Sequence, residues 1–237
     1  MARDVGNYLL ATLPAEDREW LEPLLEPVEL PRGTLLAREG EILRHIYFPV
    51  TAIISLVCDM SDGRVAEMAT FGREAVVGVP FSGVHTEALG RYVVQVPGTM
   101  LRIAPRTFRE AIDTRPAIQE MISRYMEILM ALTLQSVACN AAHSVEARCC
   151  RWILATADRT NRMEIPLTHE FLAEMLGVQR STVSEVTRVL QRKGLIDQGR
   201  GTISIRDRQR LEESACECYG RLRERYLRLL PLRSSSR

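Results

Sequence analysis

The chain has 237 residues, of which 46% are hydrophobic and 26% are charged. This composition is typical of a globular protein with one large domain or two ordinary ones, and it excludes an intrinsically disordered chain. No apolar run approaches the roughly 20 residues needed to span a bilayer, and the N-terminus lacks the apolar core of a signal peptide. We therefore expect a soluble cytoplasmic protein with no membrane partner.

The charges are distributed unevenly along the chain. Residues 1–142 hold 13 basic and 18 acidic side chains, whereas residues 143–237 hold 18 and 12, although the formal net charge of the whole is only +1. A basic C-terminal region suits a polyanionic partner, but a solvated surface has a similar composition. The two parts of the chain are thus expected to face different partners.

The first 115 residues predict a β domain. Residues 8–30 form a short amphipathic stretch in which a helix can begin at Pro14 and must end before Pro27. From 32 to 103, short runs rich in β-branched and apolar residues alternate with glycines and turn residues. Many short strands at this spacing predict an antiparallel sandwich or barrel, here a jelly-roll-like β domain in an α+β chain.

Residues 117–139 contain no proline or glycine and predict a long amphipathic helix. The apolar stripe can pack on the β domain, or it can pair with the same helix of a second subunit, because about 23 residues at 1.5 Å each outreach a small β domain. We predict a dimerisation helix and hinge over 116–142. The predicted interface residues are Ile118, Met121, Ile122, Tyr125, Ile128, Leu129 and Leu132.

The segment from 168 to 205 predicts two short helices and a β wing, within a C-terminal domain over 143–237. Thr168 can cap a first helix, Gly177 supplies a turn, and a second helix runs from Arg180 to Arg192. The strands of the wing turn at 199–201. The side chains expected to be buried are Leu172, Ala173, Leu176, Val183, Val186 and Leu190. This is the spacing of a helix-turn-helix.

The outer face of the second helix carries side chains that suit DNA. Arginine can bond guanine O6 and N7 together, glutamate accepts from cytosine N4, and hydroxyl groups bind phosphates. A solvated helix face is the alternative, and the basic wing favours DNA. The predicted DNA-binding residues are Thr168, Arg180, Ser181, Thr182, Ser184, Glu185, Arg188 and Arg200.

The order of these parts, with the stretch "LTHEFLAEMLGVQRSTVSEVTRVLQRKGLI" and its wing, resembles the bacterial cyclic-AMP receptor and fumarate–nitrate regulator (Crp/Fnr) family of transcription regulators. The resemblance covers nearly the whole chain from residue 10 to 205. It implies a homodimer that binds a near-palindromic site in double-stranded DNA, acts on RNA polymerase, and senses a signal in its β domain. Ser184 matches the serine common in the fumarate–nitrate branch, whereas Ser181 and Glu185 depart from the family pattern.

The sensor region departs further. Cyclic-nucleotide binders of this family follow a glycine with glutamate and later place an Arg-Ser or Arg-Thr pair on the cyclic phosphate. This chain has Val79 after Gly78, and Ala88-Leu89 where the pair would stand. A buried phosphate without its arginine is an unpaired charge, which costs several kcal/mol. We expect an unidentified effector other than cyclic AMP. The alternative is an unusual nucleotide, if a shifted strand register turns Arg91 inward.

Cysteines and histidines give no metal or cofactor prediction. No cysteine precedes Cys58, which argues against the N-terminal iron–sulfur cluster of the family, and His45, His85, His143 and His169 are isolated in the sequence. The neighbours Cys149 and Cys150 follow the hinge, where burial in the core outweighs a redox role. Cys216 and Cys218 fall in a predicted C-terminal helical extension.

These observations predict a homodimeric, sequence-specific DNA-binding transcription regulator. The alternative is a regulatory subunit whose β domain gates a protein partner without specific DNA binding. An enzyme is not expected, because no Ser/His/Asp arrangement, phosphate-cradling loop or clustered metal ligands are apparent.

Overall fold

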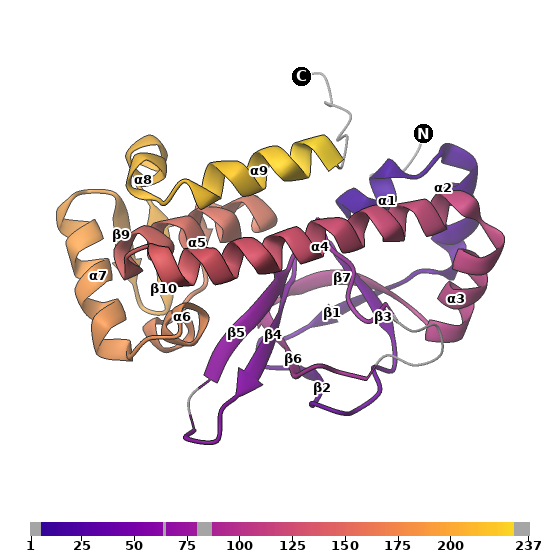
Figure 1. The fold of residues 1–237 in the computed structure, drawn as a ribbon, viewed down its shortest axis with the longest axis horizontal. Coiled ribbons are helices and arrows are strands. Elements are labelled where there is room, and N and C mark those ends of the chain that lie inside the picture. The colour runs from indigo at the N-terminus through magenta and orange to yellow at the C-terminus, as the bar shows by residue number, and fades with distance from the viewer. Residues whose placement is uncertain (1–5, 64, 80–86, 230–237) are drawn as a thin grey trace. The chain divides into compact units, whose positions relative to one another are not determined.

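The computed structural model describes residues 6–63, 65–79 and 87–229. The chain forms two compact units. The first unit draws on Met1–Val57, Ala69–Ala131 and Arg225–Arg237, and the second on Cys58–Met68 and Leu132–Glu224. Figure 1 follows the elements from the N-terminus to the C-terminus.

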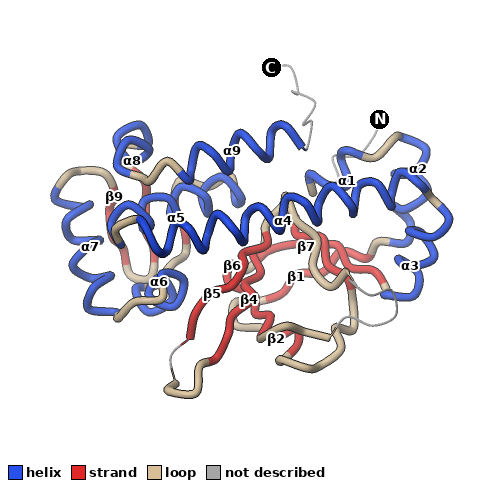
Figure 2. The backbone as a smooth tube through the Cα atoms, in the orientation of Figure 1, coloured by secondary structure: helices blue, strands red, loops and turns tan. Residues whose placement is uncertain are grey.

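The N-terminal region is a β domain built from two antiparallel sheets, as predicted. It opens with helices α1 (Tyr8–Thr12) and α2 (Ala15–Leu21) and the 3₁₀ helix η1 (Glu22–Leu24). The strands are β1 (Glu26–Leu30), β2 (Leu35–Ala37), β3 (Ile46–Pro49), β4 (Ile53–Asp59), β5 (Val65–Phe71), β6 (Arg91–Val96) and β7 (Gly98–Ile103). One sheet has the order β1-β7-β3 and the other the order β2-β6-β4-β5, and Figure 2 shows these strands in red.

The helical stretch ends before Pro27, as predicted, and Pro27 itself lies inside a strand. The helical stretch ends by Leu24, and β1 then pairs antiparallel with β7, with Pro27 opposite Leu101. Because β1 is an edge strand, it has a neighbouring strand on one side only. A proline, which lacks a backbone N–H, is tolerated there without loss of a hydrogen bond between strands. Sequence periodicity does not indicate this strand because all five of its side chains are solvent-exposed or half-buried.

Helix α3 (Pro105–Thr114) leads from the β domain into the long helix α4 (Pro116–Ala142). Phe108 of α3 packs edge-on against Phe48 of β3, with ring centroids 5.5 Å apart, and both rings are fully buried. This contact anchors the start of the helical region on the β domain.

The apolar stripe predicted as a dimer interface on α4 is mostly buried within its own chain. Ile118, Met121, Ile122, Tyr125 and Ile128 are at most 9% exposed, and Leu129 and Leu132 are half-buried. The first five side chains therefore belong to the chain's own core, as in the alternative that packs the stripe on the β domain. The exposed apolar side chains of α4 lie on another face: Met130, Leu134 and Val137 are 68%, 65% and 65% exposed.

The second unit contains the predicted helix-turn-helix and wing. Its elements are α5 (Val145–Thr160), β8 (Glu164–Ile165), α6 (His169–Leu176), α7 (Arg180–Arg192), β9 (Ile196–Gly199), β10 (Thr202–Ile205) and α8 (Arg208–Ser214). Strands β8, β10 and β9 form a three-stranded antiparallel sheet in that order. Helix α9 (Cys218–Leu229) follows.

The C-terminal extension is two helices, not the single helix that its sequence predicts. Asp207 caps α8 through its carboxylate, and the chain becomes extended at Ala215 (φ −78°, ψ 156°) before α9 begins. Cys216 therefore lies in a connection between helices, and Cys218 is the first residue of α9. In the part of the chain that the structure describes, no helix combines the length and hydropathy required to cross a membrane.

Candidate nucleic-acid interface

Local capping sets the geometry of α6 and α7. The Thr168 hydroxyl accepts a hydrogen bond from the backbone N–H of Phe171 at 3.2 Å, which fixes the start of α6. Gly177 ends this helix in the left-handed conformation with φ +64°, which a residue without Cβ adopts without strain. The chain then turns through two residues into α7, as the sequence predicted.

The inner face of α7 is anchored by three fully buried residues, Val183, Thr187 and Leu190. The sequence prediction placed Val186 in this core, but Val186 is only half-buried and Thr187 takes the inner position. Burying the Thr187 hydroxyl is tolerated because it donates to the carbonyl oxygen of Val183 at 2.9 Å. Because threonine is polar, the sequence pattern does not predict that Thr187 is buried.

The outer face of α7 and the wing present the predicted DNA-binding side chains to solvent. Arg180, Ser181, Glu185 and Arg188 are exposed, as are Thr168 and, in the wing, Arg200, while Thr182 and Ser184 are half-buried. Within the described residues, Arg180, Arg188 and Arg200 form no ion pair. Their guanidinium groups can therefore donate hydrogen bonds to a phosphate or a guanine base without first breaking an ion pair within the protein.

His169 joins the first helix, the second helix and the wing, a role that the sequence did not indicate. Its Nδ1 lies 3.1 Å from Oγ of Ser184, and its Nε2 lies 2.6 Å from Oε1 of Gln198 in β9. Thr187 Oγ1 is 3.3 Å from the same Nε2, and Gln198 in turn donates to Gln191 at 3.0 Å. These bonds fix α7 relative to the wing. His85 lies outside the described residues.

The orientation of the motif also depends on a buried arginine. Arg148 of α5 is 8% exposed, and its Nη1 donates to the carbonyl oxygen of Leu176 at 3.2 Å and to Oδ1 of Asn140 at 2.7 Å. It thus satisfies a carbonyl at the C-terminal end of α6, where cations are favoured. Lys193 pairs with Glu146 at 2.7 Å and connects the end of α7 to α5.

The adjacent cysteines of α5 are core residues. Cys149 and Cys150 are both fully buried. Burial raises the pKa of Cys149 well above its usual value and that of Cys150 to about 12. Both thiols stay protonated near neutral pH and are poor nucleophiles, so a redox role for this pair is not supported.

Comparison with known protein families agrees with this architecture. Residues 147–214 match the model of the Crp-like helix-turn-helix domain. Residues 27–115 match the model of the cyclic nucleotide-binding domain. The first match contains α6, α7 and the wing, and the second contains all seven strands of the β domain except the first residue of β1.

Relatives match most of the length of the chain. The chain is 25% identical over 201 residues to the CRP-like cAMP-activated global transcriptional regulator of Mycobacterium tuberculosis, covering 81% of this chain and 88% of that one. Its fold is similar to that of FixK2 from Bradyrhizobium japonicum (TM-score 0.69, 15% identity, 81% and 98% of the two chains). It is also similar to the c-di-GMP responsive regulator CLP of Xanthomonas campestris (TM-score 0.64, 17% identity, 82% and 100%). With its β domain, long helix and winged helix-turn-helix, the chain belongs to the Crp/Fnr family of DNA-binding, non-enzymatic transcription regulators.

Proposed function

We propose that α7 is the recognition helix and that it reads bases in the major groove of a specific operator. The observation that carries this proposal is the contrast between its two faces, with Val183 and Leu190 fully buried and Arg180 and Arg188 exposed. An arginine near the N-terminal end of such a helix is placed to bond guanine O6 and N7. Arg180, at the first position of α7, is the residue we assign to this role.

The remaining predicted contacts divide between bases and phosphates. Ser181 and Glu185 are exposed on α7 and suit base edges, while Thr168 at the start of α6 suits a phosphate. Arg200 lies at the turn of the wing, where its charge can neutralise a phosphate irrespective of sequence. Thr182 and Ser184 are half-buried, and Ser184 already bonds within the protein, so we assign them supporting contacts.

We propose further that the chain acts as a homodimer through the exposed face of α4. Met130, Leu134, Val137 and Ala141 are all exposed and follow one another at steps of four, three and four residues. This is the spacing of an apolar seam in a two-stranded coiled coil. The seam replaces the interface predicted from the sequence, whose first five members are buried within the chain. Two copies would present two recognition helices to a near-palindromic site, from which a regulator of this family acts on RNA polymerase.

The effector of the β domain is proposed to be a ligand other than cyclic AMP. The relative from M. tuberculosis is named for activation by cAMP, yet this chain has Val79 after Gly78 and Ala88-Leu89 at the later position. Ala88 is buried and Leu89 is 62% exposed, and neither can neutralise a phosphate. Gly78 has a separate reason to be glycine, because at φ +90° a Cβ there would lie 2.9 Å from the carbonyl oxygen of His45. Residues 80–86 lie outside the described residues.

A salt titration of DNA binding distinguishes the proposed DNA-binding regulator from a subunit that binds only a protein partner. The affinity for a labelled duplex, measured by fluorescence anisotropy, should fall steeply with salt because phosphate contacts release counterions. A flat response would contradict the proposal. For the effector, calorimetric titration of the full chain with cyclic AMP should give no binding, and stoichiometric binding would contradict that part of the proposal alone.

A further inference from the structure

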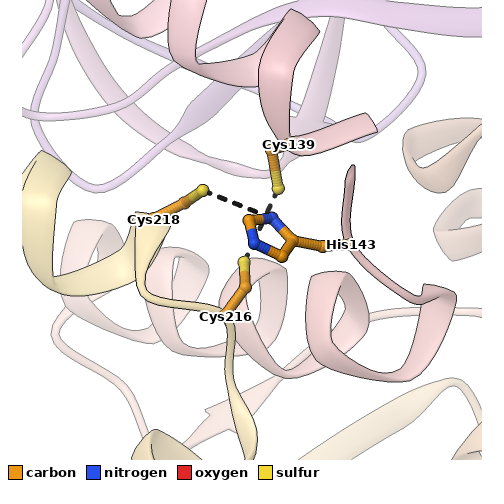
Figure 3. A group of neighbouring side chains, drawn as sticks. All are labelled: Cys139, His143, Cys216 and Cys218. Carbon is orange, nitrogen blue, oxygen red and sulfur yellow. Dashed lines mark hydrogen bonds between the residues drawn. The ribbon is translucent and has the colours of Figure 1, made fainter. Parts of the chain in front are cut away.

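Four side chains that are remote in the sequence converge in the second unit: Cys139, His143, Cys216 and Cys218. Their ligand atoms, three sulfurs and an imidazole nitrogen, all lie within 4.8 Å of one another. Cys139 is in the last turns of α4, and His143 follows four residues later, just beyond the end of that helix. Cys216 comes from the connection between α8 and α9, and Cys218 begins α9. Figure 3 shows the sulfurs and the imidazole turned toward a common point.

We infer that these four residues form a Cys₃His site for a single zinc ion. The Sγ atoms of Cys139 and Cys216 are 3.6 Å apart, and Sγ of Cys218 is 3.6 Å from Nδ1 of His143. A tetrahedral zinc with Zn–S bonds of about 2.3 Å and Zn–N bonds of about 2.0 Å places neighbouring ligand atoms roughly 3.5–3.8 Å apart. These two distances match the edges of a zinc tetrahedron, and the remaining ligand atoms lie within 4.8 Å of one another.

The same distances argue against other uses of the cysteines. An iron–sulfur cluster distributes its protein ligands over two or more irons separated by bridging sulfides, which requires a wider spread than four atoms within 4.8 Å. A disulfide needs sulfurs about 2.05 Å apart, and all three cysteines are free thiols. Three thiolates and one imidazole are a common ligand set of structural zinc.

Burial makes this a closed site. Cys139, Cys216 and Cys218 are at most 5% exposed, and together they form a small buried cluster against which Ala147 packs. Binding one Zn²⁺ there converts three thiols to thiolates, releases three protons and leaves a net charge of −1 on the site. With four protein ligands and little solvent access, the ion has a structural role and no open coordination position.

The groups around the four residues support zinc binding. Oε2 of Glu217 lies 2.9 Å from Nε2 of His143, so this nitrogen can donate its N–H to the carboxylate while Nδ1 faces the ion. The side-chain amide of Gln135 donates to Sγ of Cys218 at 3.0 Å, a contact that favours a thiolate. Zinc-binding histidines usually donate the N–H of the other ring nitrogen to a carboxylate, a backbone carbonyl or water, which fixes the tautomer and the ring orientation.

The start of α9 is held in place independently of the four ligands. The hydroxyl of Tyr219, the residue after Cys218, donates to Oδ2 of Asp158 in α5 at 2.7 Å. Arg208 of α8 donates both to Oδ1 of Asp158 at 2.6 Å and to the Tyr219 oxygen at 2.7 Å. These contacts position Cys218 before an ion binds. Less conformational entropy is therefore lost from this segment when the ion binds.

The location of the site suggests its consequence. Its ligands come from 139–143 and 216–218, and the chain between them contains α5, α6, α7 and the wing. The ion therefore joins the segment that enters the winged helix domain to the segment that leaves it. Closing this loop stabilises the domain, as a cross-link between distant residues does.

Metal analysis of the full chain tests the inference. Protein produced in zinc-supplemented medium and purified with reductant should contain about one zinc per chain by mass spectrometry of the metals. Cobalt added to the metal-free chain should give thiolate-to-metal charge-transfer absorption and the intense visible bands of tetrahedral Co²⁺. Absence of stoichiometric metal together with absence of the cobalt spectrum would overturn the site, and so would stoichiometric iron with inorganic sulfide.

Substitutions locate the ion and separate binding from folding. Cys139→Ser and Cys216→Ser should each lose the zinc, whereas the control Cys58→Ser, which removes a half-buried thiol outside the site, should keep it. Retention of zinc in both of the first two variants would overturn the assignment. Glu217→Gln should still bind one zinc at saturation but about 10–100-fold more weakly, measured by chelator competition. An unchanged affinity would exclude Glu217 as the partner of a zinc-bound His143.

Discussion

His169 Nδ1 lies 3.1 Å from Ser184 Oγ, which joins the first residue of α6 to the middle of α7. The opposite ring nitrogen of His169 reaches Gln198 of the wing at 2.6 Å. One imidazole thus holds the three elements that are proposed to contact DNA in a single arrangement. These contacts point to a positioning role for His169 on α7, the proposed recognition helix, rather than to direct contact with bases.

Replacing His169 with alanine tests that role. His169→Ala should lower the free energy of unfolding by about 1–2 kcal/mol, because partners in α7 and the wing lose hydrogen bonds. Specific DNA affinity should fall as well, since α7 and the wing are no longer fixed to each other. Denaturant unfolding and anisotropy measure the two effects. His45→Ala, in the β domain, is the control, and equal DNA affinity of both variants would contradict the positioning role.

Arg180→Ala should cost about 1–3 kcal/mol of specific binding and relax the preference at one base pair of the operator. The reason is the loss of the proposed bidentate contact to guanine. Competition between the operator and single-base variants of it measures this effect. Arg180 would not be a base-reading residue if the variant bound operator and random DNA with the same proportional loss.

Arg200→Ala should behave differently from Arg180→Ala. Because a phosphate contact is independent of sequence, operator and random DNA should be weakened alike, and the slope of log affinity against log salt should fall by about one. Affinities measured over a series of salt concentrations give this slope. An unchanged slope would show that the wing arginine does not contact the backbone.

Leu134→Glu should convert the proposed dimer to a monomer, because it places a charge in the middle of the α4 seam. Sedimentation velocity gives the oligomeric state, and Gln119→Glu, which adds the same charge at an exposed position of α4 outside the seam, is the matched control. A dimer that survives Leu134→Glu would exclude this face as the interface.

Short sequence patterns are sufficient to predict the helix-turn-helix and the wing. The burial of the other elements depends on packing between distant parts of the chain, which the sequence pattern does not show. Capping by Thr168 and the turn at Gly177 are contained in a few neighbouring residues, and the structure confirms both. On α4, by contrast, apolar side chains occupy more than one face. Only the tertiary fold decides that Ile118 and Tyr125 are buried while Leu134 stays exposed.

The cysteine cluster was missed for the same physical reason. Cys139 and Cys216 are 77 positions apart, and no C-x-x-C pair indicates the site. The available signals were the four-residue step from Cys139 to His143, which places both on one side of a helix, and the short Cys-x-Cys spacing at 216–218. Because the sequence pattern around that second pair predicts one continuous helix, it does not predict the turn that brings the thiols together.

Selection of bound fragments from random DNA tests the central claim most directly. Full-length protein should enrich an inverted repeat whose half-sites lie about one helical turn apart, roughly 34–36 Å, as expected for two α7 helices in successive major grooves. The Arg180→Ala variant should lose the preference at one position of each half-site. Enrichment of no sequence, or of a single unrepeated element, would contradict recognition by a dimer of this chain.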